Sequence, residues 1–158
     1  MRILVFSDSH GRSAPVENAI AAHGEAKTVI FLGDGARELL HLTEIFPDRT
    51  FLFVRGNCDF GGDLPSSGEI KVEGRTVFYT HGHEYSVGLS TDRLEKAARA
   101  RGADIVLYGH THIARIEYRD GLYIVNPGSV AHPREGGCSF AMIDILPSGI
   151  VPIIADIR

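Results

Sequence analysis

The sequence has no tryptophan, only two cysteines and no long apolar stretch. Two cysteines form at most one disulfide bond, which excludes a disulfide-stabilised scaffold. A membrane-spanning helix requires ~20 consecutive apolar residues, so no membrane segment is predicted. Positive charge is not in excess, because 16 Lys and Arg stand against 20 Asp and Glu, giving a formal net charge of −4. A large basic surface for binding nucleic acid is therefore not expected.

The start of the chain does not have the pattern of a secretory signal. Residues 1–6 form a short apolar run that leads directly to Asp8 and His10, whereas a signal has a longer apolar stretch and small residues at a cleavage site. We therefore expect a cytoplasmic protein. A length of 158 residues with 44% apolar content suits one domain, residues 1–158, because no linker, internal repeat or low-complexity segment divides the chain.

Short runs of β-branched and aromatic residues predict strands that are covered on both faces. In the first two thirds of the chain the runs are Ile3 to Phe6, Thr28 to Leu32, Thr50 to Val54, Thr76 to Tyr79 and Ile105 to Tyr108. Helices are predicted from Ser13 as N-cap to Ala22, from Ala36 to Phe46 and from Thr91 to Ala100, because Gly or Pro follows each. Residues 60–68 are expected to form a loop beside the site described below.

The last third of the chain has strand patterns joined by short turns. The predicted strands are Ile113 to Arg119, Leu122 to Val125, Cys138 to Ile145 and Ile150 to Ile154, and Asp120-Gly121 is a hairpin signal. Alternating strands and helices followed by strands alone predict an α/β fold in which mixed β-sheets pack together with helices outside. An exposed edge strand in this part could pair with a second copy, so a homo-oligomer is one expectation.

Polar side chains follow five predicted strands at the point where each strand ends. The segments are Ser7-Asp8-Ser9-His10-Gly11, Gly33-Asp34-Gly35, Arg55-Gly56-Asn57-Cys58-Asp59, Thr80-His81-Gly82-His83 and Gly109-His110-Thr111-His112. The carboxyl ends of strands are where sites assemble in open α/β sheets, and glycine permits close approach to a ligand. Taken singly, Asp34 and Asn57 are ordinary turn residues and His81 could be a core histidine. Ordinary turn or core roles at all five strand ends at once are implausible, which favours one shared site.

Imidazoles, carboxylates and an amide oxygen form a mixed nitrogen and oxygen ligand set. This set suits Mn, Fe, Zn, Ni or Co better than Mg or Ca. Seven candidate ligands are too many for one tetrahedral ion and suit two ions that share a ligand. Two divalent ions, two carboxylates and a bridging hydroxide leave a net charge of about +1, which would attract an anionic substrate such as a phosphate ester.

In this order the segments resemble the calcineurin-like metallophosphoesterase superfamily, and in particular its small single-domain prokaryotic phosphodiesterases. The resemblance runs from residue 1 to about residue 145 and includes Gly56-Asn57-Cys58-Asp59 and Asn126-Pro127-Gly128-Ser129. It implies a four-layer α/β/β/α sandwich with two mixed sheets. It also implies a first ion bound by Asp8, His10, Asp34 and His112, and a second ion bound by Asp34, Asn57, His81 and His110. Asp34 would thus bridge the two ions, manganese being the first choice of metal.

The resemblance also implies residue roles in phosphodiester hydrolysis. A metal-bridging hydroxide would attack phosphorus in line, with His81 preferred by analogy over His83 as the ligand. The amide of Asn57 would also contact a phosphate oxygen, Asp59 would orient an imidazole or a water, and His83 and Arg134 would contact the substrate. The turn at residues 126–129 would either line the pocket or only connect strands.

Cys58 departs from the family pattern. Many relatives have a histidine after the Gly-Asn pair as the proton donor to the leaving group, and a thiol is a poorer acid. Because an activated alcohol leaves a diester without such an acid, we favour a phosphodiesterase for small-molecule phosphate esters. The alternative from another class is a non-catalytic metal-binding scaffold, as in the eukaryotic retromer coat. A nuclease is disfavoured because the chain has no basic stripe.

Overall fold

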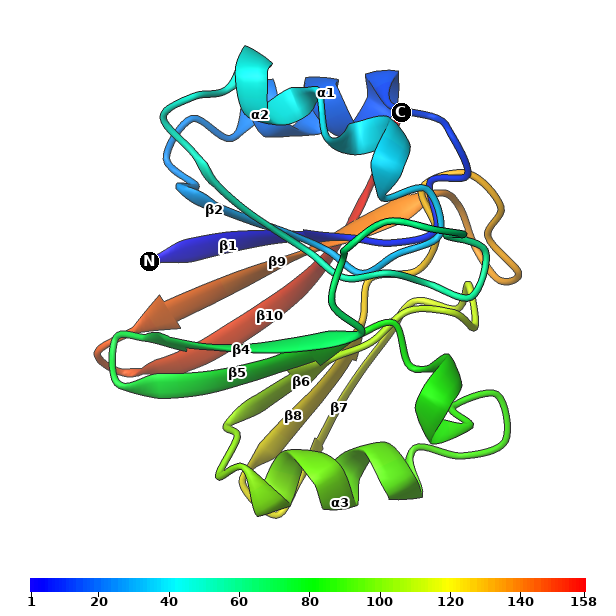
Figure 1. Cartoon of the computed structure of the whole chain (residues 1–158). Coiled ribbons are helices and arrows are strands. Elements are labelled where there is room, and N and C mark those ends of the chain that lie inside the picture. Colours follow the sequence, from blue (N-terminus) through cyan, green and yellow to red (C-terminus); the bar gives the residue numbers. More distant parts are fainter.

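The computed structural model describes residues 1–158, which form two five-stranded mixed sheets packed face to face (Figure 1). The first sheet has the order β10-β9-β1-β2-β3. Its strands are β1 (Arg2–Phe6), β2 (Thr28–Phe31), β3 (Thr50–Phe53), β9 (Ser139–Leu146) and β10 (Gly149–Asp156). The second sheet has the order β4-β5-β6-β8-β7. Its strands are β4 (Ser67–Val72), β5 (Arg75–Thr80), β6 (Ile105–Leu107), β7 (Arg115–Arg119) and β8 (Leu122–Asn126).

Helices cover the outer face of each sheet, which completes the four layers of the predicted α/β/β/α sandwich (Figure 1). Helix α1 (Ala14–Ala22), the 3₁₀ helix η1 (Arg37–Leu39) and α2 (Leu42–Ile45) lie over the first sheet. Helix α3 (Asp92–Ala100) lies over the second sheet, and the 3₁₀ helix η2 (His83–Tyr85) precedes it. The fold class expected from the sequence is confirmed. None of these helices has the length and apolar character required to cross a membrane.

Three apolar clusters hold the layers together. The central cluster of 14 buried residues lies between the sheets and includes Ile3, Ile30 and Ile105. A second cluster joins α1 and α2 to the first sheet through residues such as Ile20, and a third joins α3 to the second sheet through residues such as Leu94. Strands β1, β6 and β8 are buried almost throughout, as the continuous apolar runs predicted.

Two of the predicted elements differ from the structure. The helix expected from Ala36 to Phe46 is two short pieces, η1 and α2. Ala36, Leu39 and Leu42 are all buried, and their spacing of three matches the turn of a 3₁₀ helix better than that of an α-helix. Ser13 precedes α1 as expected but makes no side-chain cap hydrogen bond.

Strand β4 was not predicted, because its sequence, Ser-Gly-Glu-Ile-Lys-Val, has few apolar residues. The strand forms at a sheet edge through pairing with β5. Gly68 is required there because a Cβ at that position would collide with the ring of Tyr79. The expected loop of residues 60–68 therefore ends in the first two residues of this strand.

The strand directions bring the sequence segments of interest to one edge. Strands β1, β2 and β3 are mutually parallel, as are β5, β6 and β8. Their carboxyl ends lie on the same side of the sandwich, at the right of Figure 1. Hydrogen bonds join the loops of the two sheets there, from the His81 Nδ1 to the Leu32 carbonyl (2.7 Å) and from the His110 amide to Asp8 Oδ2 (3.1 Å).

Candidate metal centre

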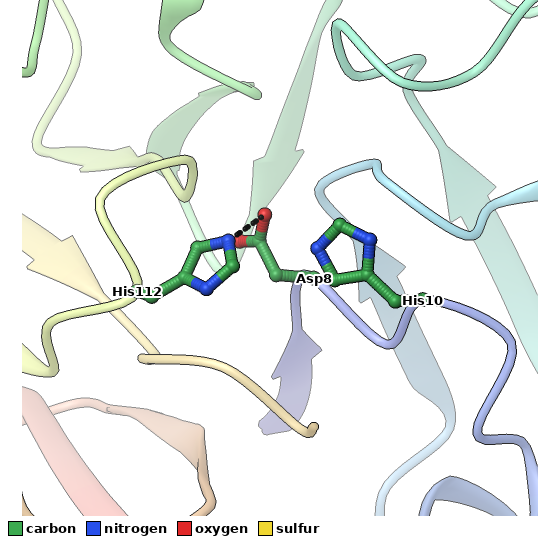
Figure 2. A group of neighbouring side chains, drawn as sticks. All are labelled: Asp8, His10 and His112. Carbon is green, nitrogen blue, oxygen red and sulfur yellow. Dashed lines mark ion pairs between the residues drawn. The ribbon is translucent and has the colours of Figure 1, made fainter. Parts of the chain in front are cut away.

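Asp8 lies at the centre of the converging loops. Its side chain is fully buried at the end of β1, where Oδ2 accepts hydrogen bonds from the Ser7 hydroxyl (2.6 Å) and the His110 amide (3.1 Å). Its Oδ1 has no hydrogen-bond donor and lies 3.1 Å from the Nε2 of His112. Figure 2 shows Asp8 between the rings of His10 and His112, and the ligand atoms of these three residues all lie within 4.8 Å of one another.

A second group of donor atoms, buried more deeply, shares Asp8. It consists of Asp8, Asp34 and His81, again with ligand atoms within 4.8 Å of one another. The Nε2 of His81 lies 3.5 Å from Asp34 Oδ2 and 4.0 Å from Asp8 Oδ1. The residue common to the two groups is Asp8, whereas the family resemblance gives Asp34 as the bridge.

Asn57 and His110 extend the second group towards the surface. The amide oxygen of Asn57 lies 3.0 Å from His81 Nε2 and 2.9 Å from His110 Nδ1. The rings of His81 and His110 are 5.2 Å apart. All seven predicted ligands therefore lie around the carboxylates of Asp8 and Asp34, although they come from five loops and span 105 residues of sequence.

The backbone is strained at this edge. Eight residues other than glycine have a positive φ, and five of them are candidate ligands: Asp8 (54°), His10 (43°), Asp34 (58°), His110 (69°) and His112 (59°). Such a conformation is uncommon outside glycine and costs on the order of 1 kcal/mol or more per residue. Strain concentrated on polar residues indicates a functional site, because glycine in those positions would fold more easily.

Backbone carbonyls fix the orientation of two imidazoles. The Nδ1 of His81 donates to the Leu32 carbonyl, and the Nδ1 of His112 donates to the His132 carbonyl; the donor–acceptor distance is 2.7 Å in each case. A carbonyl oxygen can only accept, so each neutral ring carries its hydrogen on Nδ1 and presents the lone pair of Nε2 to the carboxylates. Metal-binding histidines are held in this way.

Asp59 makes contacts different from those expected of it. Its two oxygens accept four backbone hydrogen bonds, from the amides of Asp34 (2.7 Å), Gly35 (2.9 Å), Ala36 (3.1 Å) and Gly56 (2.8 Å). It touches no imidazole, because its carboxylate is fully used in joining the loops after β2 and β3. Its contacts are those of a residue that holds the Asp34 and Asn57 loops in register.

The turn at residues 126–129 also positions the loops. Asn126 and Ser129 are fully buried. The Asn126 amide donates to the Gly109 carbonyl (3.1 Å) and to Thr111 Oγ1 (3.0 Å), and the Ser129 hydroxyl donates to the Asp8 carbonyl (2.8 Å). This turn therefore supports the loops of Asp8 and of His110 and His112 from behind. Ser7 has a similar role, and no sequence signal distinguished it.

The remaining candidates lie at the rim. The ring of His83 is 5.3 Å from that of His81, and burial lowers its pKa. Cys58 is exposed beside Asn57, and its pKa is raised by burial and by the nearby carboxylates of Asp34, Asp59 and Asp8, so the thiol is protonated at neutral pH. Arg134 is exposed, and its amide donates to the His112 carbonyl (3.0 Å).

The charges of the site favour a cation. Without a cation, a proton on the Nε2 of His81 takes its place: burial raises the pKa of Asp34, but the hydrogen bond and charge of protonated His81 and the Cys58 amide hold that pKa well below its usual range. Burial likewise tends to lower the pKa of His81, yet Asp34 and Asp8 raise it. A buried carboxylate oxygen without a donor, next to inward-facing imidazole lone pairs, is what a divalent cation would satisfy. The residues present fit such an ion.

Comparison with known proteins gives the family. A sequence model described as the calcineurin-like phosphoesterase superfamily domain matches residues 1–147. The chain belongs to this superfamily. Probable metallophosphoesterase YsnB of Bacillus subtilis is 33% identical over 135 residues, covering 85% of this chain and 78% of that protein. Phosphodiesterase MJ0936 of Methanocaldococcus jannaschii is 37% identical over 162 residues, covering 91% and 93%.

Solved structures show the same fold. A predicted phosphoesterase from Streptococcus pneumoniae superposes with a TM-score of 0.80 at 26% identity, covering 98% of this chain and 97% of that one.

In sequence, the chain is also similar to vacuolar protein sorting-associated protein 29 of Schizosaccharomyces pombe, 37% identical over 76 residues, which cover 48% of this chain and 41% of that protein. The names of the relatives from Bacillus subtilis and Methanocaldococcus jannaschii, a probable metallophosphoesterase and a phosphodiesterase, describe enzymes that act on phosphate esters.

Proposed function

We propose that this protein is a phosphodiesterase that depends on two divalent transition-metal ions, with manganese the first choice, and acts on a small-molecule phosphate ester. The supporting observation is the convergence of seven nitrogen and oxygen donors on the buried carboxylates of Asp8 and Asp34, where Asp8 Oδ1 has no hydrogen-bond donor. Beyond the matched residues 1–147, β10 pairs with β9 along its whole length, so residues 1–158 are proposed to be one domain.

The proposed ligand sets follow the family pattern. One ion would be held by Asp8, His10, Asp34 and His112, and the other by Asp34, Asn57, His81 and His110. Such ions, when bound, supply water activated at neutral pH and neutralise charge that develops on phosphate oxygens. Iron, nickel, zinc and cobalt fit the same donors.

The residues of the chain would then position the ester. Asn57 has an NH₂ group directed towards Cys58 Sγ (3.5 Å), a weak partner that a phosphate oxygen could replace. His83 and Arg134 stand at the rim, where a substrate would pass. Asp59 holds the Asn57 and Asp34 loops together, so that attack on phosphorus can proceed in line with the bond that breaks.

Diester cleavage is favoured over monoester cleavage by the residue at position 58. A raised thiol pKa makes Cys58 a poor proton donor at neutral pH. Without a strong acid, substrates with good leaving groups are cleaved best. We therefore expect aryl phosphodiesters to be better substrates than alkyl monoesters.

The test is reconstitution of metal-free protein with Mn²⁺, followed by assays with bis(p-nitrophenyl) phosphate and with a simple alkyl monoester. We expect about two ions per chain by elemental analysis and hydrolysis of the diester. An exposed histidine outside the loops, His41, provides the control His41→Ala, which should keep both metal content and activity. Metal-loaded protein that cleaves no phosphodiester would refute the proposal.

The second candidate is a metal-binding scaffold without catalysis, favoured by the similarity to the vacuolar sorting protein. The completeness of the donor set argues against it. Two bound ions together with no hydrolysis of any ester would support the scaffold instead.

A further inference from the structure

A pocket adjoins the candidate metal centre on the side of the second sheet. It has a volume of about 370 Å³, and its wall includes residues 87–92, Thr111, Ile113, Glu117 and three arginines, Arg115, Arg119 and Arg134. None of the seven candidate ligands lines it. Its volume is in the range of small-molecule pockets, so it can accept one arm of an ester.

Thr111 and Arg134 join the hollow to the centre. Thr111 lies between the candidate ligands His110 and His112 in the sequence, and the Arg134 amide binds the His112 carbonyl. Thr111 Oγ1 accepts hydrogen bonds from the Asn126 amide (3.0 Å) and the Ile113 amide (3.4 Å), while its own hydroxyl hydrogen has no protein acceptor. A donor is therefore free at the boundary between centre and hollow.

The three arginines differ in their partners. Arg119 pairs with Glu95 (3.2 Å) and with Glu117, and Arg115 lies 3.8 Å from Glu117. Arg134 is exposed and takes part in none of these ion pairs, and its guanidinium makes no hydrogen bond within the protein. The arginine whose amide binds the His112 carbonyl is thus the one without a partner. An unpaired guanidinium in a hollow is suited to bind an anion in a bidentate manner.

Four of the thirteen lining residues are hydrophobic. Leu89 is 91% exposed at the mouth, and Val87, Tyr108 and Ile113 lie in the lining. The exposed leucine side chain offers apolar surface that the ring of an ester arm can cover. The pocket therefore combines the exposed apolar side chain of Leu89 with an arginine that has no partner.

We propose that this hollow, the Arg134 pocket, binds one ester arm of the substrate and that Arg134 recognises a second anionic group on that arm. The preferred substrate class is accordingly a phosphodiester in which one arm is an apolar ring carrying a carboxylate or phosphate. This inference rests on the proposed function and narrows it, because it assigns a specificity-determining residue outside the metal centre.

The test compares two diesters that differ by a single charge, phenyl p-nitrophenyl phosphate and 3-carboxyphenyl p-nitrophenyl phosphate. Both release p-nitrophenolate, so the reacting centre is the same. We expect kcat/KM of the native, metal-loaded protein to be about tenfold higher for the carboxylated diester, the ratio that a charge-assisted hydrogen bond supplies. A 3-phosphonophenyl analogue tells whether the second anion is better as carboxylate or as phosphate.

Variants of Arg134 test whether this residue recognises the second anionic group. Arg134→Gln should reduce the preference for the carboxylated diester to about twofold or less. Arg134→Lys should keep part of this preference, because the lysine ammonium keeps the positive charge but cannot form the bidentate contact of a guanidinium. The matched control is Arg37→Gln, an exposed arginine that lines a different hollow with Cys58 and Phe60, and it should leave the ratio unchanged. Equal rates with both diesters in the native protein, or an unchanged ratio in Arg134→Gln, would overturn the proposal.

Equilibrium binding separates this proposal from the proposed function. Calorimetry with phenyl phosphate and 3-carboxyphenyl phosphate should give about tenfold tighter binding of the carboxylated compound, a difference that Arg134→Gln removes. Absence of hydrolysis with this binding difference intact would refute catalysis and retain the pocket. Hydrolysis with no binding difference would refute the pocket alone.

Discussion

The two ends of the β-sandwich satisfy their polar groups in opposite ways. At the amino ends of the central strands, Arg2 forms a two-pronged pair with Asp144 (2.7 and 2.8 Å), and Asp104 accepts from Arg75 and from the Thr76 amide. At the carboxyl ends, Asp8 Oδ1 is buried without a donor. The carboxylates of Asp144 and Asp104 are thus paired within the protein, whereas one oxygen of Asp8 is left without a donor.

The backbone shows the same contrast. At the amino ends, positive φ occurs in the two-residue turns Glu73-Gly74 and Asp120-Gly121, where hairpin geometry requires it. At the carboxyl ends it occurs in Asp8, His10, Asp34, His110 and His112. The first kind of strain serves the fold and uses ordinary turn residues. The second lies on the candidate ligands, in loops that hydrogen bonds fix in place.

The largest expected effect is on catalysis. Asp34→Asn and His112→Ala should each lower kcat for an aryl phosphodiester by at least ~100-fold, because each removes a proposed ligand. The measurement is steady-state hydrolysis of bis(p-nitrophenyl) phosphate at saturating Mn²⁺. Asp144→Asn, at the opposite end, should stay within about twofold of the native rate. Full activity in both ligand variants would contradict the assignment of the centre.

Glycine substitutions should separate the two ends by stability. A Cβ on Gly56 would collide with the Asp34 carboxylate and approach the Asp34 amide within 2.6 Å, whereas a Cβ on Gly74 meets nothing within 4 Å. Gly56→Ala should therefore lower the free energy of unfolding by about 3 kcal/mol. Gly74→Ala should cost about 1 kcal/mol, from its positive φ alone.

Urea unfolding of metal-free protein measures both glycine variants. The slope of unfolding free energy against urea should stay constant, so that the midpoints report stability directly. Equal losses in the two variants would show that the carboxyl-end loops are not as tightly packed as their contacts indicate.

Metal binding should stabilise the protein through residues at the carboxyl ends of the strands only. Mn²⁺ at one hundred times its Kd should add about 2.7 kcal/mol to the unfolding free energy, which corresponds to an increase in Tm of about 5–10 °C. Thermal unfolding with and without Mn²⁺ measures the shift. Asp8→Asn should abolish it, and Asp144→Asn should retain it. A shift that survives in Asp8→Asn would place the ions elsewhere.

The smallest expected effect concerns the Arg2–Asp144 pair and pH. The hydrogen bond and charge of Arg2 lower the pKa of Asp144 below its ordinary value. Because the folded pKa is the lower one, the stabilisation is complete above about pH 4 and disappears as pH falls through the folded value. Asp144→Asn should cost about 1 kcal/mol at pH 7 and less at pH 3.

Unfolding by urea at the two pH values measures this difference. The exposed pair of Lys27 and Asp48 is the matched control, and Asp48→Asn should change stability less than Asp144→Asn at pH 7. An Asp144→Asn loss that does not depend on pH would show that the pair contributes through packing and not through charge.

Most strands and the site residues could be predicted because their signals are local. Strand patterns in the sequence identified every strand except β4 within a few residues, β7 included, and polar residues after five of them marked the common edge. Strand β4 and the 3₁₀ helix η1 escaped, since the first depends on pairing with β5 and the second on burial of Leu39 and Leu42 against a sheet. Neither contact is visible from neighbouring residues.

The amino-acid types and their order limit the chemistry of the site, because covalent structure alone supplies the side chains of Asp8, His10, Asp34, Asn57, His81, His110 and His112. How these groups are used depends on the folded chain. Asp59 binds four amides instead of an imidazole, and His81 and His112 face inward through Nε2, because strands distant in sequence bring the amides and carbonyls within hydrogen-bonding distance. Residue identity is local, whereas the partner of each polar atom is set by long-range packing.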